Sequence, residues 1–321
     1  MVILGSLYVT KYFRASILPS NLSHLGALPA RFRRQRVLIV GCGDVGLRVA
    51  SALPSAVRVL ALTTSSERVP ELRALGITPL LGNLDQRASL RRLAAMGTRV
   101  LHLAPPPPEG WIDARTRRLT QALRRRSAPI ALVYGSTSGV YGDCQGEVAA
   151  ETKAVHAQTP RALRRVDAEA AVRLLGRGGA TRTSILRIPG IYAPDRVGGT
   201  PRERLLKGTP VLRQQDDVYT NHIHADDLAR ACIAALWRGK PQRVINVNDD
   251  SDLKMGDYFD LAADLYGLTR PPRVPRATAQ GSLPLLLLSF MSESRRMDNR
   301  RLKRELRLRL RYPTVGTGLL S

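Results

Sequence analysis

The segment that most constrains this chain is residues 36–53, where an apolar run, three glycines and a stretch of helical periodicity follow one another. The run Val37–Val40 is rich in β-branched residues, which predicts a strand buried on both faces. Gly41, Gly43 and Gly46 give the spacing G-x-G-x-x-G at the point where that strand ends. This order of strand, glycine turn and helix is typical of a dinucleotide-binding site. The alternative is a glycine-rich turn that binds no ligand.

Each residue of the glycine turn has its own physical task in such a site. We expect Gly41 to allow the tight turn, Gly43 to let the backbone approach a pyrophosphate, and Gly46 to let the helix pack against the strand. The helix is expected to begin at Asp44 and Val45, where free N–H groups and the positive end of the helix dipole face the phosphates. The turn therefore predicts cofactor contacts for all five residues.

The end of the second predicted strand, residues 57–62, indicates which dinucleotide binds. In a site that prefers NAD, an acidic residue roughly twenty positions beyond the glycines holds the ribose hydroxyls. Here the strand runs into Thr63 and further small hydroxyl residues, followed by Glu67 and Arg68. We therefore expect Thr63 and Arg68 at the ribose and favour NADP as the cofactor. NAD is the alternative, which Glu67 would support, and Arg68 would then be a solvated helix residue.

Strands and helices alternate further along the chain, which predicts right-handed crossovers and a parallel sheet. The fold class is therefore α/β, a Rossmann-type doubly wound parallel sheet with a smaller C-terminal substrate region. Ala104 ends the fourth predicted strand, at 99–104, and precedes a proline run that forms a stiff loop near the cofactor. The predicted parts are a basic N-terminal extension at 1–35, a dinucleotide-binding Rossmann domain at 36–190, and the substrate region at 191–321, of which 221–248 return to the Rossmann core.

The charge of the chain is strongly positive, with 50 lysines and arginines against 26 acidic residues and a net charge of +24. Such a field attracts anions, including nucleic acids and phosphorylated small molecules. The arginines recur along the whole chain without interleaved aromatic residues, which disfavours nucleic acid as the partner. We therefore expect an anionic small-molecule substrate.

Cysteine usage and hydropathy bear on the compartment of the protein, on metal binding and on membrane insertion. Three widely separated cysteines give no disulfide framework and no zinc motif, so we expect a cytoplasmic protein without a metal site. No apolar run is long enough to span a membrane. Residues 1–35 contain bases and no acidic residue, as in a targeting presequence, although we favour a flexible extension or an upstream start codon. The basic tail at 293–310 is interpreted either as a cover for the substrate cleft or as a surface element.

Four later segments carry motifs in a fixed order: GSTSGVYGD at 135–143, LRIPGIYAP at 186–194, NHIHADDLA at 221–229 and VINVN at 244–248. With these motifs and the glycine turn, the chain resembles the extended short-chain dehydrogenase/reductase superfamily, of the NAD-dependent epimerase/dehydratase type. The resemblance implies a Rossmann fold and a bound NAD(P). It also implies that Asp85 holds the adenine and that Thr137 hydrogen-bonds the reacting carbonyl or hydroxyl. A homodimer is left open as the oligomeric state.

One departure from the superfamily concerns its catalytic pair, Tyr-x-x-x-Lys on the helix that follows the fifth strand. In this chain that helix is predicted at 160–175, and counting back from its Ala-Glu pair places Arg161 and Arg165 at the two positions. None of the nine tyrosines has a lysine four residues later. Arginine stays protonated in proteins and cannot replace the tyrosine as an acid or base. The chain is therefore similar to the atypical members, which keep the dinucleotide fold and lack this pair.

Thr137 and Tyr141 are then the best candidates for chemistry. A tyrosine can act as an acid or base when nearby positive charge lowers its pKa; the alternative for Tyr141 is a packed loop residue with a bonded hydroxyl. His222 and His224 lie two apart and share a face of an extended segment. They are interpreted as structural, with an acid/base or a metal pair as alternatives.

Together these features predict an NAD(P)-dependent oxidoreductase or epimerase/dehydratase-like enzyme acting on a hydroxyl or carbonyl of an anionic small molecule. The retained loop from Thr137 to Tyr141 favours this function. The alternative, which the missing pair favours, is a non-catalytic NAD(P)-binding redox sensor or regulatory protein.

Overall fold

The computed structural model of this 321-residue chain describes residues 35–125 and 127–321. Of the predicted N-terminal extension it describes only Gln35, so our interpretation of residues 1–34 lies outside the described residues. None of the helices in the described ranges is long and apolar enough to cross a membrane.

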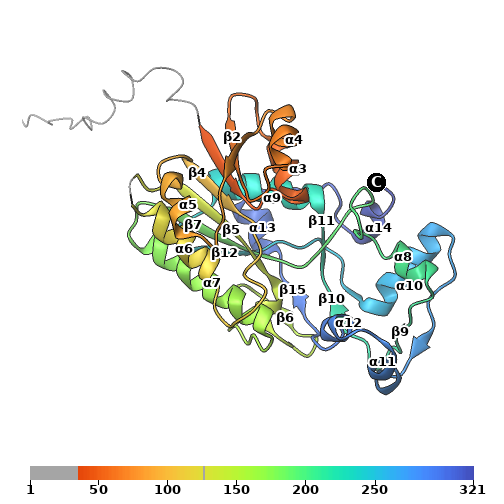
Figure 1. The fold of residues 1–321 in the computed structure, drawn as a ribbon. Coiled ribbons are helices and arrows are strands. Elements are labelled where there is room, and N and C mark those ends of the chain that lie inside the picture. The colour runs from red at the N-terminus through yellow and green to blue at the C-terminus, as the bar shows by residue number, and fades with distance from the viewer. Residues whose placement is uncertain (1–34, 126) are drawn as a thin grey trace, which may run out of the picture. The chain divides into compact units, whose positions relative to one another are not determined.

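Seven parallel strands form one central sheet, which confirms the predicted Rossmann-type α/β fold (Figure 1). The strands are β1 (Arg36–Val40), β2 (Arg58–Thr63), β3 (Thr78–Leu81), β4 (Arg99–His102), β5 (Ala131–Thr137), β7 (Arg182–Ile188) and β12 (Arg243–Asn246). From edge to edge their order is β12-β7-β5-β4-β1-β2-β3. The order changes direction between β1 and β4, and sheets of this kind bind ligands beside that point, at the carboxyl ends of the strands.

Helices cover both faces of the sheet, because alternate residues of each strand point to opposite sides. One face carries α3 (Asp44–Ala52), α4 (Arg68–Ala74), α9 (Ala225–Arg238) and α13 (Arg300–Glu305), and the other carries α5 (Arg87–Leu90), η1 (Arg91–Leu93), α6 (Ala114–Leu123) and α7 (Pro160–Arg177). Along β1, Val37 and Ile39 belong to the apolar cluster of the first face, whereas Leu38 and Val40 belong to that of the second.

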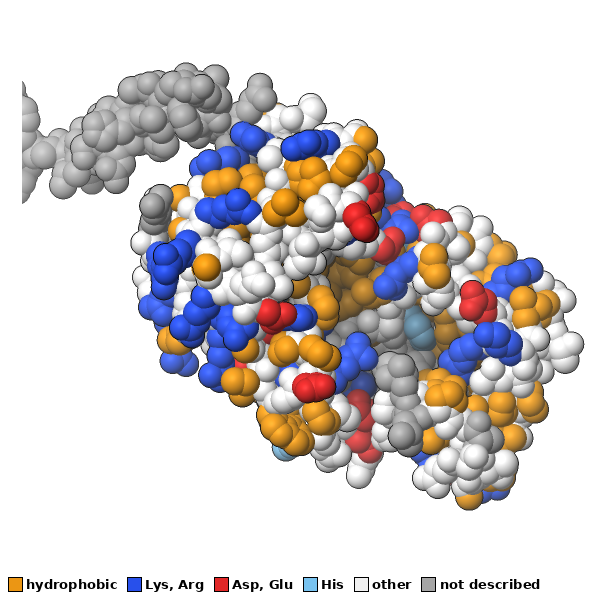
Figure 2. Space-filling view, viewed as in Figure 1, with side chains coloured by type: hydrophobic (Ala, Val, Ile, Leu, Met, Phe, Trp, Pro, Cys, Tyr) orange, Lys and Arg blue, Asp and Glu red, His pale blue; other side chains and the backbone are white. Residues whose placement is uncertain are grey.

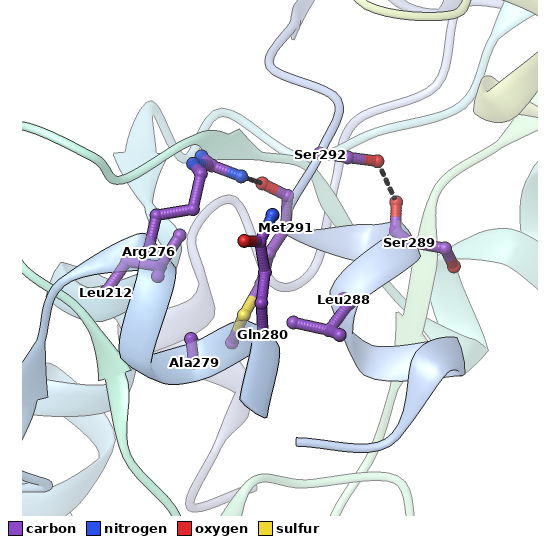
Figure 3. A pocket seen from close by; sticks show the side chains of 8 residues that line it. All are labelled: Leu212, Arg276, Ala279, Gln280, Leu288, Ser289, Met291 and Ser292. Carbon is purple, nitrogen blue, oxygen red and sulfur yellow. Dashed lines mark hydrogen bonds between the residues drawn. The ribbon is translucent and has the colours of Figure 1, made fainter. Parts of the chain in front are cut away.

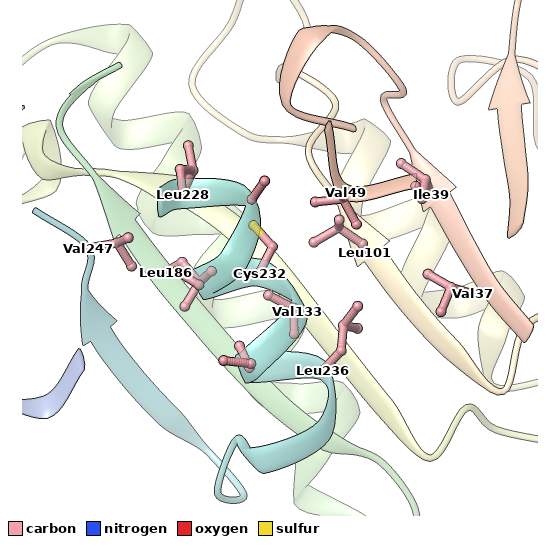
Figure 4. Close-up of a cluster of buried hydrophobic side chains, with 14 of the residues drawn as sticks. Val37, Ile39, Val49, Leu101, Val133, Leu186, Leu228, Cys232, Leu236 and Val247 are labelled. Atoms are coloured by element: carbon pink, nitrogen blue, oxygen red, sulfur yellow. The ribbon is translucent and has the colours of Figure 1, made fainter. Parts of the chain in front are cut away.

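The helix α9 joins the C-terminal half of the chain to the sheet. Figure 4 shows Leu228, Cys232 and Leu236 on the side of α9 that faces the strands, and all three are fully buried. The helix begins after His224, whose Nδ1 accepts a hydrogen bond of 3.2 Å from the backbone N–H of Asp226. Residues 221–248 therefore supply both a helix that covers the sheet and its edge strand β12.

The helix α7 runs two residues further than the sequence predicts. Its start agrees with the prediction, because the Thr159 hydroxyl accepts a hydrogen bond from the Ala162 N–H and Pro160 occupies the first position. At the other end the helix continues through Gly176, which we would read from sequence as a stop signal. A Cβ on Gly176 would lie 3.0 Å from Cγ2 of Thr183, so this glycine serves the close packing of α7 on β7.

The remaining elements build a smaller apolar cluster around α10 (Met255–Tyr266). The helices are α8 (Arg202–Leu206), α11 (Arg276–Ser282), α12 (Leu285–Phe290) and α14 (Val315–Gly318), and the 3-10 turn η2 (Ser138–Tyr141) follows β5. Four two-stranded pairs complete the fold: β8 (Gly190–Tyr192) with β11 (His222–His224), β9 (Val211–Leu212) with β14 (Arg273–Val274), β10 (Tyr219–Thr220) with β13 (Leu253–Lys254), and β6 (Val148–Ala149) with β15 (Arg296–Met297).

His102 is a buried titratable side chain at the carboxyl end of β4. Its Nε2 lies 2.8 Å from the Thr116 hydroxyl, and its Nδ1 is buried without a hydrogen-bond partner. Burial, reinforced by the charge of Arg165, lowers its pKa from 6.5 to about 3. The folded protein therefore keeps this ring neutral over a pH range in which the unfolded chain binds a proton.

Replacing this histidine with His102→Gln is expected to weaken the dependence of stability on acid pH. Between pH 6.5 and about pH 3 only the unfolded state protonates His102, so its contribution to the free energy of unfolding falls by about 1.4 kcal/mol for each pH unit of acidification. Urea denaturation of both proteins from pH 7 to pH 4 measures this slope. Equal slopes in the two proteins would contradict the assignment of a depressed pKa to His102.

Candidate functional site

The glycine turn has the geometry of a dinucleotide cradle. Gly41 has φ of +90°, and a Cβ there would lie 2.6 Å from the Ala104 Cα, so the turn packs directly on the end of β4. A Cβ on Gly46 would lie 3.2 Å from the Gly41 carbonyl oxygen, which reflects the close packing of α3 on β1. A Cβ on Gly43, by contrast, would meet nothing within 4 Å. The protein leaves open the space that a pyrophosphate would take, so these residues fit a dinucleotide.

The first turn of α3 is held by a network of charges. Arg48 donates to Asp44 at 3.1 Å and to Asp195 at 2.6 Å, and it also pairs with Asp226 at 2.5 Å. Arg196 approaches the second Asp44 oxygen at 3.3 Å. Asp44 is therefore engaged by two arginines, while Val45 beside it packs against the apolar core. The network ties the glycine turn to the segment that follows β8.

Arg68 lies beside the glycine turn. Its Nη1 donates a hydrogen bond of 2.9 Å to the Cys42 carbonyl, and its Nε pairs with Glu71 at 3.3 Å. The Thr63 hydroxyl accepts from the Ser65 N–H at 3.2 Å and shapes the turn after β2. Glu67 is exposed at the start of α4. The predicted ribose residues Thr63 and Arg68 thus both lie at the carboxyl end of β2 or just after it.

Asp85, the expected adenine contact, is held in a basic environment just beyond β3. Arg115 donates to its carboxylate at 2.7 Å, and Arg118 lies 3.6 Å away. The hydrogen bond from Arg115 lowers the pKa of Asp85, so this side chain is ionised at neutral pH. Its carboxylate is therefore committed to Arg115, and an adenine contact would use its remaining lone pairs or the backbone around it.

A cleft of about 850 Å³ opens at the carboxyl ends of β5 and β7. One wall consists of Thr137, the η2 turn and the first turn of α7, and the other of α8, α10 and the C-terminal segment around Arg295. Figure 2 shows a hollow in this face with apolar, basic and histidine side chains at its edge. The predicted substrate contact Thr137 therefore lines a cleft large enough for a small-molecule substrate.

Tyr141 does not line this cleft, so the structure gives no support for its expected catalytic role. The residue is 0% exposed, and its hydroxyl donates a hydrogen bond of 2.7 Å to Oδ1 of Asn246. Burial raises its pKa, although the Arg187 guanidinium 4.6 Å above its ring opposes that shift. Nearby positive charge does reach Tyr141, as the sequence suggested, but desolvation has the larger effect. Tyr141 is a packed tyrosine with a bonded hydroxyl.

Five arginines line the cleft, against a single acidic side chain, Glu293. Two of the five are neutralised: Arg196 by Asp44, and Arg295 by Glu293 at 2.7 Å. The other three, which have no carboxylate partner in the part of the chain that the structure describes, are Arg161, Arg164 and Arg204. The cleft therefore carries uncompensated positive charge.

The two arginines at the positions of the missing catalytic pair behave differently. Arg161 lines the cleft. Arg165 points to the sheet, where its Nη1 donates to the Tyr134 hydroxyl at 3.0 Å and to the Gly135 carbonyl at 2.9 Å. Arg165 is thus anchored at the end of β5, whereas Arg161 is available to a ligand.

The two histidines flank Tyr192, because β11 pairs with β8, and they have different surroundings. The His222 ring lines the cleft, stacks on Tyr258 with centroids 4.2 Å apart, and has a buried Nδ1 without a partner. Burial lowers its pKa to about 4. The His224 ring instead stacks on Tyr312 with centroids 3.8 Å apart. Among the described residues, no group of three or more His, Cys, Asp or Glu side chains could hold a metal ion.

A second, smaller pocket of about 280 Å³ lies between α11 and α12. Figure 3 shows Leu212, Leu288 and Met291 around it, with Arg276 donating to the Met291 carbonyl. The Arg276 side chain is held there by backbone carbonyls, including a bond of 2.6 Å to that of Asp216. The pocket is small and lacks a free charged group, so the larger cleft is the candidate site.

Sequence reasoning did not single out Arg164, Arg196 or Arg204 of the cleft. Each comes from a segment that carries several arginines, so neither spacing nor composition distinguishes it.

Comparisons with known proteins agree with this architecture. The model of the NAD-dependent epimerase/dehydratase family matches residues 37–248. A conserved protein of unknown function from Silicibacter pomeroyi is 29% identical, with a TM-score of 0.75 over 89% of this chain and 97% of its own. No curated protein sequence matches the chain.

Two solved epimerases share the fold at lower identity. UDP-glucuronic acid 4-epimerase from Bacillus cereus, in complex with NAD, is 18% identical with a TM-score of 0.69, over 88% of this chain and 95% of that one. UDP-glucose 4-epimerase from Thermotoga maritima, with UDP-glucose, is 17% identical with a TM-score of 0.73, over 88% and 96%.

Proposed function

Because the chain belongs to the NAD-dependent epimerase/dehydratase family, we propose that it uses a nicotinamide dinucleotide, preferentially NADP, to act on a hydroxyl or carbonyl of an anionic small molecule. The observation that carries the proposal is the cleft, which adjoins Thr137 and presents five arginines against one acidic side chain. Binding an anion there would compensate charge that the protein itself leaves unpaired.

The substrate class that we propose is a nucleoside-diphosphate sugar. Structural neighbours are described in complex with UDP-glucose and UDP-glucuronic acid, both of which carry a diphosphate. The Arg204 guanidinium supports this class, because its Nε and Nη2 are buried in the cleft wall without hydrogen-bond partners. Arginine suits phosphate recognition, since its planar fork donates two parallel hydrogen bonds.

The protein's own residues would position the reacting group and move its proton. When bound, the dinucleotide supplies or accepts the hydride. The Thr137 hydroxyl would hydrogen-bond the reacting oxygen from the end of β5. Only a neutral ring such as that of His222 can accept a proton, which no arginine of the cleft can do, but burial lowers its pKa to about 4 and so makes it a weak base at pH 7.

The cofactor preference is tested by titrating the purified protein with NADPH and NADH while following nicotinamide fluorescence. Wild-type protein is expected to prefer NADPH, and Arg68→Ala to weaken NADPH by about tenfold while affecting NADH little, because a 2′-phosphate would lose a charge-assisted hydrogen bond. Arg73→Ala is the matched control, since Arg73 is an exposed arginine of the same helix. A preference for NADH would contradict the assignment of NADP and point to Glu67.

Turnover is tested on a panel of nucleoside-diphosphate sugars with the cofactor-saturated protein, by absorbance of the reduced nicotinamide and by product analysis. Turnover with any of them supports the proposed enzyme. A protein that binds the cofactor tightly but turns over neither these sugars nor simple alcohols and ketones would instead be a non-catalytic NAD(P)-binding protein. Failure to bind either cofactor would contradict both the proposed enzyme and the non-catalytic NAD(P)-binding protein.

A further inference from the structure

We propose that the cleft contains a second anion subsite, formed by Arg161 and Arg164 beside Thr137, and that the substrate therefore carries a carboxylate or phosphate next to its reacting carbon. This inference rests on the proposed function, which assigns the cleft to the substrate. A substrate that carried only a diphosphate would leave the positive charges of Arg161 and Arg164, next to the reacting carbon, without an anionic partner.

The two arginines are free of opposite charge. Arg161 has no hydrogen-bond or ion-pair partner among the described residues, although it lines the cleft. Arg161 is an exposed residue, and partial desolvation together with the neighbouring charges of Arg165 and Arg164 lowers its pKa. Arg164 is only 7% exposed; its Nη1 donates to the Gly110 carbonyl at 2.6 Å, and its Nε is buried without a partner. A buried cation such as Arg164 that lacks a carboxylate partner is costly unless an anion binds to it.

The subsite adjoins the group that we expect to contact the reacting oxygen. Both arginines belong to the first turns of α7, and Ala162 between them packs on the η2 turn. A Cβ on Gly139 in that turn would lie 3.9 Å from the Ala162 Cβ. Thr137 immediately precedes η2 and lines the same cleft. An anionic group held by Arg161 and Arg164 would therefore sit next to the group contacted by Thr137.

The remaining free arginine belongs to the opposite wall. Arg204 lies on α8, and its guanidinium stacks 4.3 Å from the ring of Phe259 on α10. Burial lowers its pKa. The uncompensated charge of the cleft is thus divided between the α7 wall and the α8/α10 wall, which fits a substrate with two separate anionic groups better than one with a single group.

The test uses inorganic phosphate as the probe, with the protein saturated by NADP⁺ so that the glycine turn is filled. Phosphate binding is measured by calorimetry, and the α7 subsite is followed by the fluorescence of Trp111, which is exposed and adjacent to Gly110. Arg161→Gln is expected to weaken phosphate at this subsite by about tenfold, through loss of a charge-assisted hydrogen bond, and the double variant Arg161→Gln/Arg164→Gln to abolish the fluorescence response. Arg204→Gln should remove the other phosphate and leave the Trp111 response intact.

Two controls keep the result interpretable. Arg91→Gln removes the same charge from an exposed position on η1, so it should leave both phosphate affinities unchanged. Arg161→Gln breaks no hydrogen bond or ion pair within the described residues, so it carries less folding risk than replacing Arg164, which donates a hydrogen bond to the Gly110 carbonyl. Phosphate affinity and Trp111 response equal to wild type in Arg161→Gln/Arg164→Gln would overturn the subsite, as would an equal loss in Arg91→Gln. Because NADP⁺ binding is measured separately, failure of the cofactor site is distinguished from failure of the subsite.

Discussion

Replacing Gly43 with alanine is expected to weaken NAD(P)H binding by about a hundredfold while leaving the free energy of unfolding nearly unchanged. A Cβ at this position meets no protein atom within 4 Å, and the backbone has an ordinary φ of −87° that alanine adopts without strain. The methyl group would instead occupy the space through which a pyrophosphate approaches the turn. Nicotinamide fluorescence titration and urea denaturation measure the two effects independently.

Gly41→Ala is the matched variant, and its main expected effect is on the stability of the fold. Its φ of +90° is strained for alanine, and a Cβ would lie 2.6 Å from the Ala104 Cα. We expect a loss of several kcal/mol of stability, because both the backbone conformation and the contact between β1 and β4 must change. Undiminished cofactor binding by a well-folded Gly43→Ala protein would falsify the assignment of this turn to the pyrophosphate.

The second large effect is expected at the buried ion pair below the site. Glu169 and Arg187 have side-chain exposures of only 5% and 3%, and they are joined by two hydrogen bonds of 2.9 and 3.1 Å. The Ser136 hydroxyl donates a third bond to Glu169 at 2.8 Å, which links α7 to β5 and β7 under the cleft. Glu169→Gln keeps the shape of the side chain but leaves the Arg187 charge uncompensated, so we expect a loss of about 3 kcal/mol or more of stability.

Two comparisons identify the cause of that loss in urea denaturation. Adding Arg187→Met to Glu169→Gln should recover part of the stability, because it removes the unpaired buried charge. Asp264 and Arg270 form an ion pair at the surface, with side chains that are 50% and 62% exposed. Breaking it with Asp264→Ala is expected to lower the free energy of unfolding by less than about 1 kcal/mol. If Glu169→Gln lost as little stability as this surface variant, the buried ion pair would not contribute strongly to the free energy of unfolding.

Several features of the fold were predictable because they depend on local sequence. The β-branched run before Gly41 forms β1, and the parallel sheet follows from the alternation of strands and helices. The start of α7 also agrees with its local signals, a threonine cap and a proline in the first turn. Its end does not, because Gly176 serves packing against Thr183 on another element, and no local signal reports such a contact.

The family was also recognisable from ordered motifs, whereas the role of single residues within them was not. Tyr141 lies in the motif at 135–143, yet its side chain turns into the core toward Asn246, 105 residues later in the chain. Thr137, four residues earlier, lines the cleft. Whether a loop residue faces a ligand or the core depends on what packs over the loop, and that partner comes from distant sequence. The NADP preference and the cofactor residues stay predictions for the titrations above.

The sequence by itself determined the family, the glycine turn and the class of fold, because these follow from short-range steric requirements and from periodicity. Only the tertiary structure decided which of the 50 basic residues line the cleft and which of those lack an acidic partner among the described residues. Arg161 and Arg164 come from α7, Arg204 from α8 and Arg295 from the C-terminal segment, and these segments meet only in the folded protein. The sequence does not distinguish these arginines, but in the fold Glu293 neutralises Arg295, whereas the other three have no carboxylate partner among the described residues. That difference is set by three-dimensional proximity, since a charge is compensated by whatever lies within a few ångströms of it, regardless of its distance along the chain.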